Sequence, residues 1–247
     1  MTNVRLTRQI CAFIDVLGGA KLFRGKDKQR ASEFFACLEE FERRMNAWSP
    51  HFPAKRRTKA LVKTFSDNIF VAFPFKSSTK MDDDDVIGTF LEELIHQIHE
   101  LTMFAGFPIR GAVSIGGLMF TDKFLFGPAL VEAVELEKSA IFPRIVLSES
   151  VLRHIKPGSP IARRIVCDVD GKSFLHYLGG LSSGWLEHHK TFVENGLQEN
   201  SRHVRERQKY EWLAQYHNFS AQSAKKPEHA ISIDRSSAFS VFQPKTT

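Results

Sequence analysis

The pattern of apolar and polar positions along this 247-residue chain changes its period several times, which predicts alternating strands and helices. An almost continuous apolar run over residues 9–17 predicts a buried first strand. Apolar residues then recur every three or four positions over residues 29–48, which is typical of an amphipathic helix. Residues 60–75 hold two short apolar runs around a Ser-Asp-Asn tip, which predicts a hairpin.

The rest of the chain continues this alternation. A second helix is predicted from the aspartates at 82–85 to Gly106, then a strand over 107–120 with a return strand at FLFG, and a third helix beginning near Pro128. RIVLS predicts a strand, RRIVCDVDGKSFLHYL a hairpin, and the charged stretch 184–218 one long helix, while VFQPKTT is expected to fray. This order predicts an α/β (α+β) fold with helices packed on a mostly antiparallel sheet.

Composition narrows the function classes only moderately. A net charge of +6 and a pI near 9.3 admit nucleic acid, anionic lipid or phosphorylated ligands, and also a plain soluble basic surface. No apolar run approaches the roughly 18 residues of a membrane span, so no membrane association is expected. Asp15 interrupts the only run that resembles a signal peptide. The three scattered cysteines fit reduced side chains in a cytoplasmic protein.

Two aspartates carry the candidate chemistry. Asp15 lies in the apolar first strand, where an unpaired carboxylate is costly, and Asp67 lies at the hairpin tip. A ferredoxin-like βαββαβ order would set the two side by side, and two close carboxylates need a cation. A pair of hard divalent ions, held by carboxylates and substrate phosphates, would clamp the oxygens around one phosphorus. Taken alone, Asp15 is also explained as a helix cap or a partner of Arg110, and Asp67 as a turn residue.

The residues after Asp15 suit a phosphate. Leu17, Gly18, Gly19 and Ala20 follow the first strand and can offer backbone N–H groups, because the glycines permit a close approach. A simple turn explains the same glycines.

Three segments in sequence order, FIDVLGG, VKTFSDNIFVAF and IRGAVSIGGLMF…FLFGPALVEAVELEK, resemble the corresponding segments of class III nucleotidyl cyclases. The resemblance implies a ferredoxin-like class III cyclase fold, with a catalytic domain over residues 1–180 and a helical extension over residues 181–247 that packs on the same domain. It implies that Asp15, Asp67 and the Val16 carbonyl bind two divalent metal ions, Mn²⁺ or Mg²⁺. It also implies attack of a ribose 3′-hydroxyl on the α-phosphate of its own triphosphate, in a homodimer with sites at the interface.

Four positions bear on the substrate. Lys63 stands where the family's purine enzymes have a base-reading Lys, but Phe124 stands where they have a base-reading Asp. Adenine would lose its hydrogen-bond acceptor there, at a cost of about 1–3 kcal/mol, so a smaller base is favoured. Val131 and Glu135 replace the family's ribose-orienting Asn and transition-state Arg. The candidate basic replacements are Arg110, Lys138, Arg144 and Lys172.

The segments HHKTFVENGL…RERQKYEWLAQYHNF and FGPALVEAVELEK…PRIVLS resemble the pyrimidine cyclases of bacterial Pycsar anti-phage systems. That resemblance implies a uridylate or cytidylate cyclase, with UTP as the favoured substrate, whose cyclic product acts on a separate effector. The residues themselves do not distinguish uracil from cytosine.

Other functions stay open at this stage. The missing Asn and Arg would suit a catalytically silent nucleotide sensor, and Lys63 leaves a purine cyclase possible. A diguanylate-cyclase or polymerase-palm enzyme would share the fold and metal pair, but TFSDNI matches the GGDEF hairpin poorly. A ferredoxin-like RNA-binding module would stack bases on aromatic residues of a central strand, and IRGAVSIGGL has none, so nucleic acid is not the expected partner.

Overall fold

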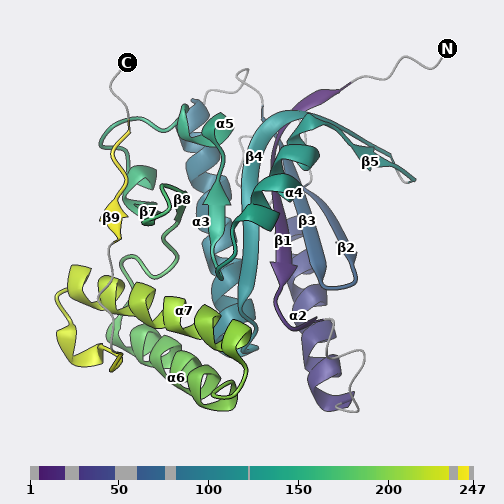
Figure 1. Ribbon diagram of the computed structural model, residues 1–247. Coiled ribbons are helices and arrows are strands. Elements are labelled where there is room, and N and C mark those ends of the chain that lie inside the picture. The colour runs from purple at the N-terminus through teal and green to yellow at the C-terminus, as the bar shows by residue number, and fades with distance from the viewer. Residues whose placement is uncertain are drawn as a thin grey trace.

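The computed structural model describes residues 6–19, 28–47, 60–75, 82–121, 123–233 and 239–244 (Figure 1). Its strands are β1 (Thr7–Val16), β2 (Leu61–Phe65), β3 (Asn68–Pro74), β4 (Ile109–Phe120), β5 (Leu125–Phe126), β6 (Ile145–Leu147), β7 (Ile165–Cys167), β8 (Ser173–Leu175) and β9 (Ser240–Val241). Its α-helices are α2 (Lys28–Ala47), α3 (Asp83–His99), α4 (Pro128–Ser139), α5 (Glu149–Leu152), α6 (Ser183–Glu199) and α7 (Val204–Ser223). The shorter helical turns are η2 (Glu100–Phe104), η3 (Ile161–Arg164) and η4 (Pro227–His229).

One sheet organises the described chain, in the order β2-β3-β1-β4-β6-β8-β7-β9 with β5 beside β4. Among the described strands, β4 and β6 pair in parallel and the other pairings are antiparallel. The first four strands therefore have the 2-3-1-4 order of a ferredoxin-like βαββαβ unit, with α2 and α3 as its two connections. The predicted fold class, an α/β fold with a mostly antiparallel sheet and packed helices, is confirmed.

Strand β1 lies at the centre and is buried on both faces. Ile10 and Ile14 point to one face and share a core with α2 and α3, while Cys11 and Phe13 point to the other face and pack beneath α4. This two-sided burial follows from the period-2 alternation of a strand whose residues are apolar in both positions. The helices α2 and α3 accordingly cover one side of the sheet and α4 the other (Figure 1).

The C-terminal region differs from the single long helix that the charged stretch predicts. It forms two helices, α6 and α7, joined by a turn at residues 200–203. The Asn200 side chain donates to the Gly196 carbonyl at 2.8 Å and helps to end α6. A Cβ on Gly196 would lie 2.0 Å from Cε1 of Tyr210, so this glycine allows α7 to pack closely against α6. The spacing of apolar residues along the sequence does not predict this contact between the two helices.

The last described segment returns to the sheet. Val241 of β9 pairs with Val166, where the sequence predicts a frayed tail, and residues 245–247 lie outside the described residues. The Phe239 ring lies 5.6 Å from Trp212 and 5.9 Å from Phe174, centroid to centroid, so apolar burial explains the order of the tail. The predicted domain boundary at residue 180 stays a prediction. Within the described residues, no helix has the length and apolarity needed to cross a membrane.

Candidate active site

Asp15 and Asp67 come together at one end of the sheet. In the register of β1 and β3, Asp15 lies opposite Asn68, the residue that follows Asp67. The Val16 N–H donates to the Asp67 carbonyl at 2.8 Å, which fastens the hairpin tip to the end of β1. The predicted convergence of these residues on adjacent strand ends is therefore present in the structure.

The hairpin tip has an unusual backbone. Ser66 has φ of 57°, in the left-handed region that few non-glycine residues occupy. The Ser66 hydroxyl donates to Oδ1 of Asp67 at 3.0 Å, and the Asn68 amide donates to the same oxygen at 3.3 Å. These two local hydrogen bonds support the tip and orient the Asp67 carboxylate.

Gly19 packs directly against Asp67. A Cβ on Gly19 would lie 2.6 Å from Cβ of Asp67, so only glycine fits without displacing the aspartate. Gly18 has φ of 91°, which also favours glycine. The Leu17 N–H, in contrast, donates to the Pro108 carbonyl at 2.8 Å, so it is not available to a phosphate as the sequence suggested. Ala20 lies outside the described residues.

Arg110 joins Asp15 to Glu137. Strand β4 places Arg110 opposite Asp15. Its Nη2 lies 2.8 Å from Oδ2 of Asp15, and its Nε lies 2.5 Å from Oε1 of Glu137. Burial raises the pKa of Asp15 above its ordinary value; Arg110 opposes the rise, while Glu137 and Asp67 add to it through like charge. The alternative that Asp15 pairs with Arg110 is thus also realised.

The donor set fits a hard divalent cation. Within the described part of the chain, no group of three or more His, Cys, Asp or Glu side chains is arranged to hold a metal ion. Ions of the Mg²⁺ type are commonly held by one or two carboxylates, with waters and substrate phosphates completing the shell. Asp15, Asp67 and the neighbouring Val16 carbonyl supply that kind of partial oxygen shell. Oδ1 of Asp15 has no hydrogen-bond partner among the described residues, because the Arg110 contact uses Oδ2.

Three of the predicted substrate residues lie elsewhere in the chain. Lys63 is exposed on β2, where it pairs with Phe70. Phe124 is 62% exposed in the turn between β4 and β5. Since β4 rises about 3.3 Å per residue, Phe124 is roughly 30 Å along the strand from Arg110. Lys172 lies on the β7–β8 hairpin. Lys63, in contrast, lies in the same sheet as Asp15, two strands away and in register with Phe13 through Phe70.

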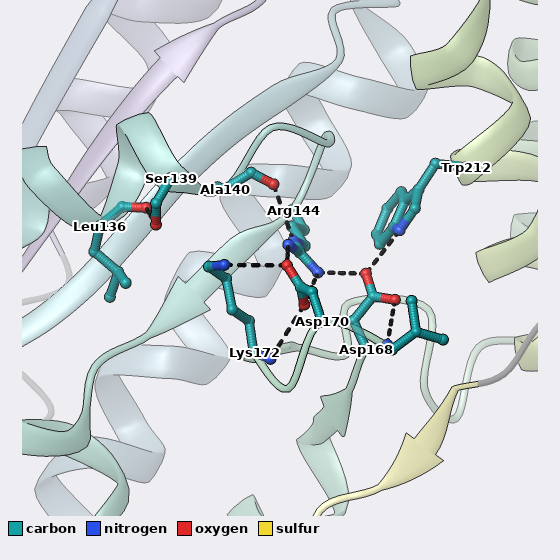
Figure 2. Close-up of polar contacts among 9 residues, drawn as sticks. Leu136, Ser139, Ala140, Arg144, Asp168, Asp170, Lys172 and Trp212 are labelled. Atoms are coloured by element: carbon teal, nitrogen blue, oxygen red, sulfur yellow. Dashed lines mark hydrogen bonds and ion pairs between the residues drawn. The ribbon is translucent and has the colours of Figure 1, made fainter.

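Lys172 and Arg144 belong to a separate ionic cluster (Figure 2). The fully buried Arg144 guanidinium pairs with Asp168 and lies 2.5 Å from Oδ2 of Asp170. The Trp212 indole N–H donates to Asp168 at 2.8 Å, and Lys172 lies 3.1 Å from Asp170. Burial alone would raise the pKa of Asp170, but its bonds to Arg144 and Lys172 lower it to about 2.

This cluster removes Arg144 from the candidate basic replacements, because its side chain is enclosed and pairs with Asp168, which also binds Trp212 of α7. The sequence named Arg144 as a basic candidate and gave no sign of its partners, which lie 24 and more residues away. Val131 and Glu135 are exposed on α4, so the places of the family's Asn and Arg face solvent in the single chain.

One cavity of the described chain lies away from the two carboxylates. It has a volume of about 690 Å³ and is lined by residues of α2, α6 and α7, among them Arg30, His188 and Tyr210. Asp15 and Asp67 are instead partly exposed where the ends of β1 and β3 meet.

No family model matches the chain, and no curated protein matches it. Solved structures with a similar fold include the catalytic core of a rhodopsin-guanylyl cyclase with converted specificity in complex with ATPαS (16% identity, 70% of this chain and 98% of that one, TM-score 0.49). A bacterial light-regulated adenylyl cyclase is 15% identical over 70% of this chain and 92% of its own (TM-score 0.44). A class III adenylyl cyclase-like ATP-binding protein from Pseudomonas aeruginosa is 9% identical over 71% and 39% (TM-score 0.45). At these identities and TM-scores the likeness carries no conclusion about the chemistry of the site.

Proposed function

We propose that this chain is a class III nucleotidyl cyclase that converts a pyrimidine nucleoside triphosphate, UTP in preference to CTP, to its 3′,5′-cyclic monophosphate and pyrophosphate. The observation that carries the proposal is the meeting of Asp15 and Asp67 on adjacent strand ends, where Asp67 also packs against Gly19 of the turn that follows β1. The cyclase-like segments of the sequence supply these same residues.

The reaction needs positioning and charge neutralisation more than covalent work by the protein. Asp15, Asp67 and the Val16 carbonyl would hold two divalent cations, which when bound lower the pKa of the ribose hydroxyl and neutralise the triphosphate. The oxygen donors are hard and anionic, as such cations require. Gly18, where a Cβ would meet nothing within 4 Å, leaves room for the triphosphate to approach the backbone near Asp15, and Gly19 makes room for Asp67.

The active enzyme is proposed to be a homodimer with two equivalent sites at its interface. Exposed apolar side chains gather on the β4–β5 arm and on the adjoining α4: Phe120, Phe124, Phe126 and Val131. The arm extends away from the rest of the chain (Figure 1). Several exposed apolar side chains on one surface are typical of a protein interaction site. A partner chain would bring its Lys63 and Phe124 toward Asp15 and Asp67.

The base preference rests on Phe124. This ring offers no acceptor to the amino group of adenine, and its size favours a pyrimidine in a dimer that places it over the base. The resemblance to Pycsar cyclases extends the proposal to a role in anti-phage defence, in which the cyclic nucleotide acts on a separate effector.

The test is to incubate the purified chain with each of the four nucleoside triphosphates and Mn²⁺ or Mg²⁺ and to identify cyclic products by mass. Cyclic UMP is expected to dominate, and Asp67→Asn is expected to abolish it. Asp85→Asn, which changes an exposed aspartate in the first turn of α3, is the matched control and should leave the product unchanged. Cyclic AMP as the main product would refute the base preference.

A silent nucleotide sensor is the second candidate, and it is favoured by Val131 and Glu135 at the places of the catalytic Asn and Arg. The two functions differ in turnover. Tight binding of UTP by a folded chain, with no cyclic product under any metal condition, would support the sensor and exclude the cyclase.

A further inference from the structure

Glu137 is a buried carboxylate in an unfavourable place. It lies in the last turn of α4, where the helix dipole disfavours negative charge, and its side chain is only 5% exposed. Among the described residues its side chain contacts one cation, the Nε of Arg110 at 2.5 Å. A buried carboxylate at a helix C-terminus is costly unless a cation meets it, so Glu137 and Arg110 must be considered as one unit.

Arg110 divides its guanidinium between two carboxylates. The Nε edge faces Glu137, and the Nη2 group faces Asp15 at 2.8 Å. Without Glu137, the full positive charge of Arg110 would face Asp15, the proposed cation ligand. The contact with Glu137 therefore weakens the competition between Arg110 and a divalent cation for Asp15.

The formal charges express the same point. Asp15, Asp67 and Glu137 contribute three negative charges and Arg110 one positive charge, which leaves −2 around the site. Replacing Glu137 by a neutral residue would leave −1. Because divalent cations bind through these charges, the local charge balance adds to the effect of the two ligands themselves.

We propose that Glu137 is a positioning residue for the cation site, because it holds Arg110 by its Nε and so leaves the Asp15 carboxylate more available to divalent cations. This inference rests on the proposed metal-dependent function. It assigns α4, which carries no proposed metal ligand, an influence on metal affinity through Arg110.

The experiment measures Mn²⁺ binding by isothermal titration calorimetry on the full chain without nucleotide. Glu137→Gln keeps the size of the side chain and an oxygen that can accept from Arg110, but it removes the charge. The Kd for Mn²⁺ is expected to rise about tenfold. Glu39→Gln, which removes an exposed carboxylate from α2, should leave the Kd unchanged.

A double variant distinguishes charge balance from structural damage. Arg110→Met combined with Glu137→Gln removes both charges and restores −2 around Asp15 and Asp67, so Mn²⁺ affinity should recover to within about threefold of the wild type. Circular dichroism and thermal melting confirm folding of each variant. An unchanged Kd in folded Glu137→Gln, or no recovery in a folded double variant, would overturn the inference alone. Failure of the wild type to bind Mn²⁺ in a manner sensitive to Asp67→Asn would overturn the proposed function as well.

Discussion

The imidazole rings of His189 and His217 stack between α6 and α7, with their Nδ1 atoms 3.1 Å apart and their planes 7° from parallel. The carbonyl of His229 lies 2.9 Å from Nε2 of His217 and can only accept, so that nitrogen carries a proton. In neutral His217, Nδ1 is then the acceptor, and Nδ1–H of His189 is the donor. The Tyr177 hydroxyl, 3.4 Å from Nε2 of His189, completes a one-directional chain that holds both rings neutral.

This arrangement predicts that the protein loses stability in mild acid. Burial lowers the pKa of His189 well below its ordinary value and also lowers that of His217, while burial lowers the pKa of His176 to about 4. In the unfolded chain these histidines take up protons near pH 6.5, whereas in the folded chain they stay neutral to lower pH. Their contribution to stability is therefore fully present above pH 6.5 and is lost as the pH falls below it. Each such histidine contributes up to about 1.4 kcal/mol per pH unit in this window. Urea titrations at pH 7.5, 6.5, 5.5 and 5.0 measure the slope.

The control for this prediction separates buried from exposed histidines. In His217→Gln the free energy of unfolding should depend less steeply on pH, because one histidine that stays neutral in the folded chain is gone. His96→Gln changes an exposed side chain and should leave the slope unaltered. Equal slopes for the wild type and His217→Gln, with both proteins folded at pH 7.5, would contradict the role assigned to the pair.

The cluster around Arg144 predicts that its two carboxylates, Asp168 and Asp170, contribute very differently to the free energy of unfolding. Asp168→Asn removes the nearly buried charge partner of a fully buried guanidinium, so the free energy of unfolding should fall by about 3–5 kcal/mol. Asp170→Asn alters a carboxylate that is 33% exposed while Asp168 remains in place, so the loss should be near 1 kcal/mol. Urea unfolding of the two variants measures both values. A loss for Asp170→Asn as large as that for Asp168→Asn would show that the two carboxylates balance the charge of Arg144 equally, despite their different exposure.

The sequence predicted the elements around the site well because their signals are local. The apolar run of β1, the hairpin tip at Asp67 and the start of α4 at Pro128 each depend on neighbours within a few positions. The ion pairs that join these elements at the site are formed between residues far apart in the sequence. Glu137 meets Arg110 across 27 positions, and Arg110 meets Asp15 across 95. No periodicity marks such pairs, so the sequence offered Arg110 only as one alternative among several.

The close contact between Gly19 and Asp67 predicts a specific loss of activity. Gly19→Ala places a methyl group 2.6 Å from Cβ of Asp67, so the hairpin tip must shift and the proposed cyclase rate should fall at least tenfold. Gly184→Ala provides the opposite control, because its Cβ meets nothing within 4 Å and it lies within α6. That variant should be about 0.5–1 kcal/mol more stable and equally active. A fully active Gly19→Ala protein would mean that the Asp67 position is not critical.

A site shared between two chains predicts complementation between variants that are inactive alone. Asp67→Asn damages the proposed metal half of each site and Lys63→Met the proposed base-reading half, so each homodimer should form little cyclic product. In a mixed dimer, one site carries both changes and the other carries neither. Random exchange makes half of the dimers mixed, each with one intact site, so the activity of the mixture should return to about a quarter of the wild-type value, and that of isolated mixed dimers to about half. Coexpression with two affinity tags isolates the mixed dimers.

The control is a mixture of Asp67→Asn with Asp15→Asn, which both damage the metal half and should stay inactive together. Complementation in neither mixture would place the whole site within one chain. Complementation in both would show that the two aspartates do not act together.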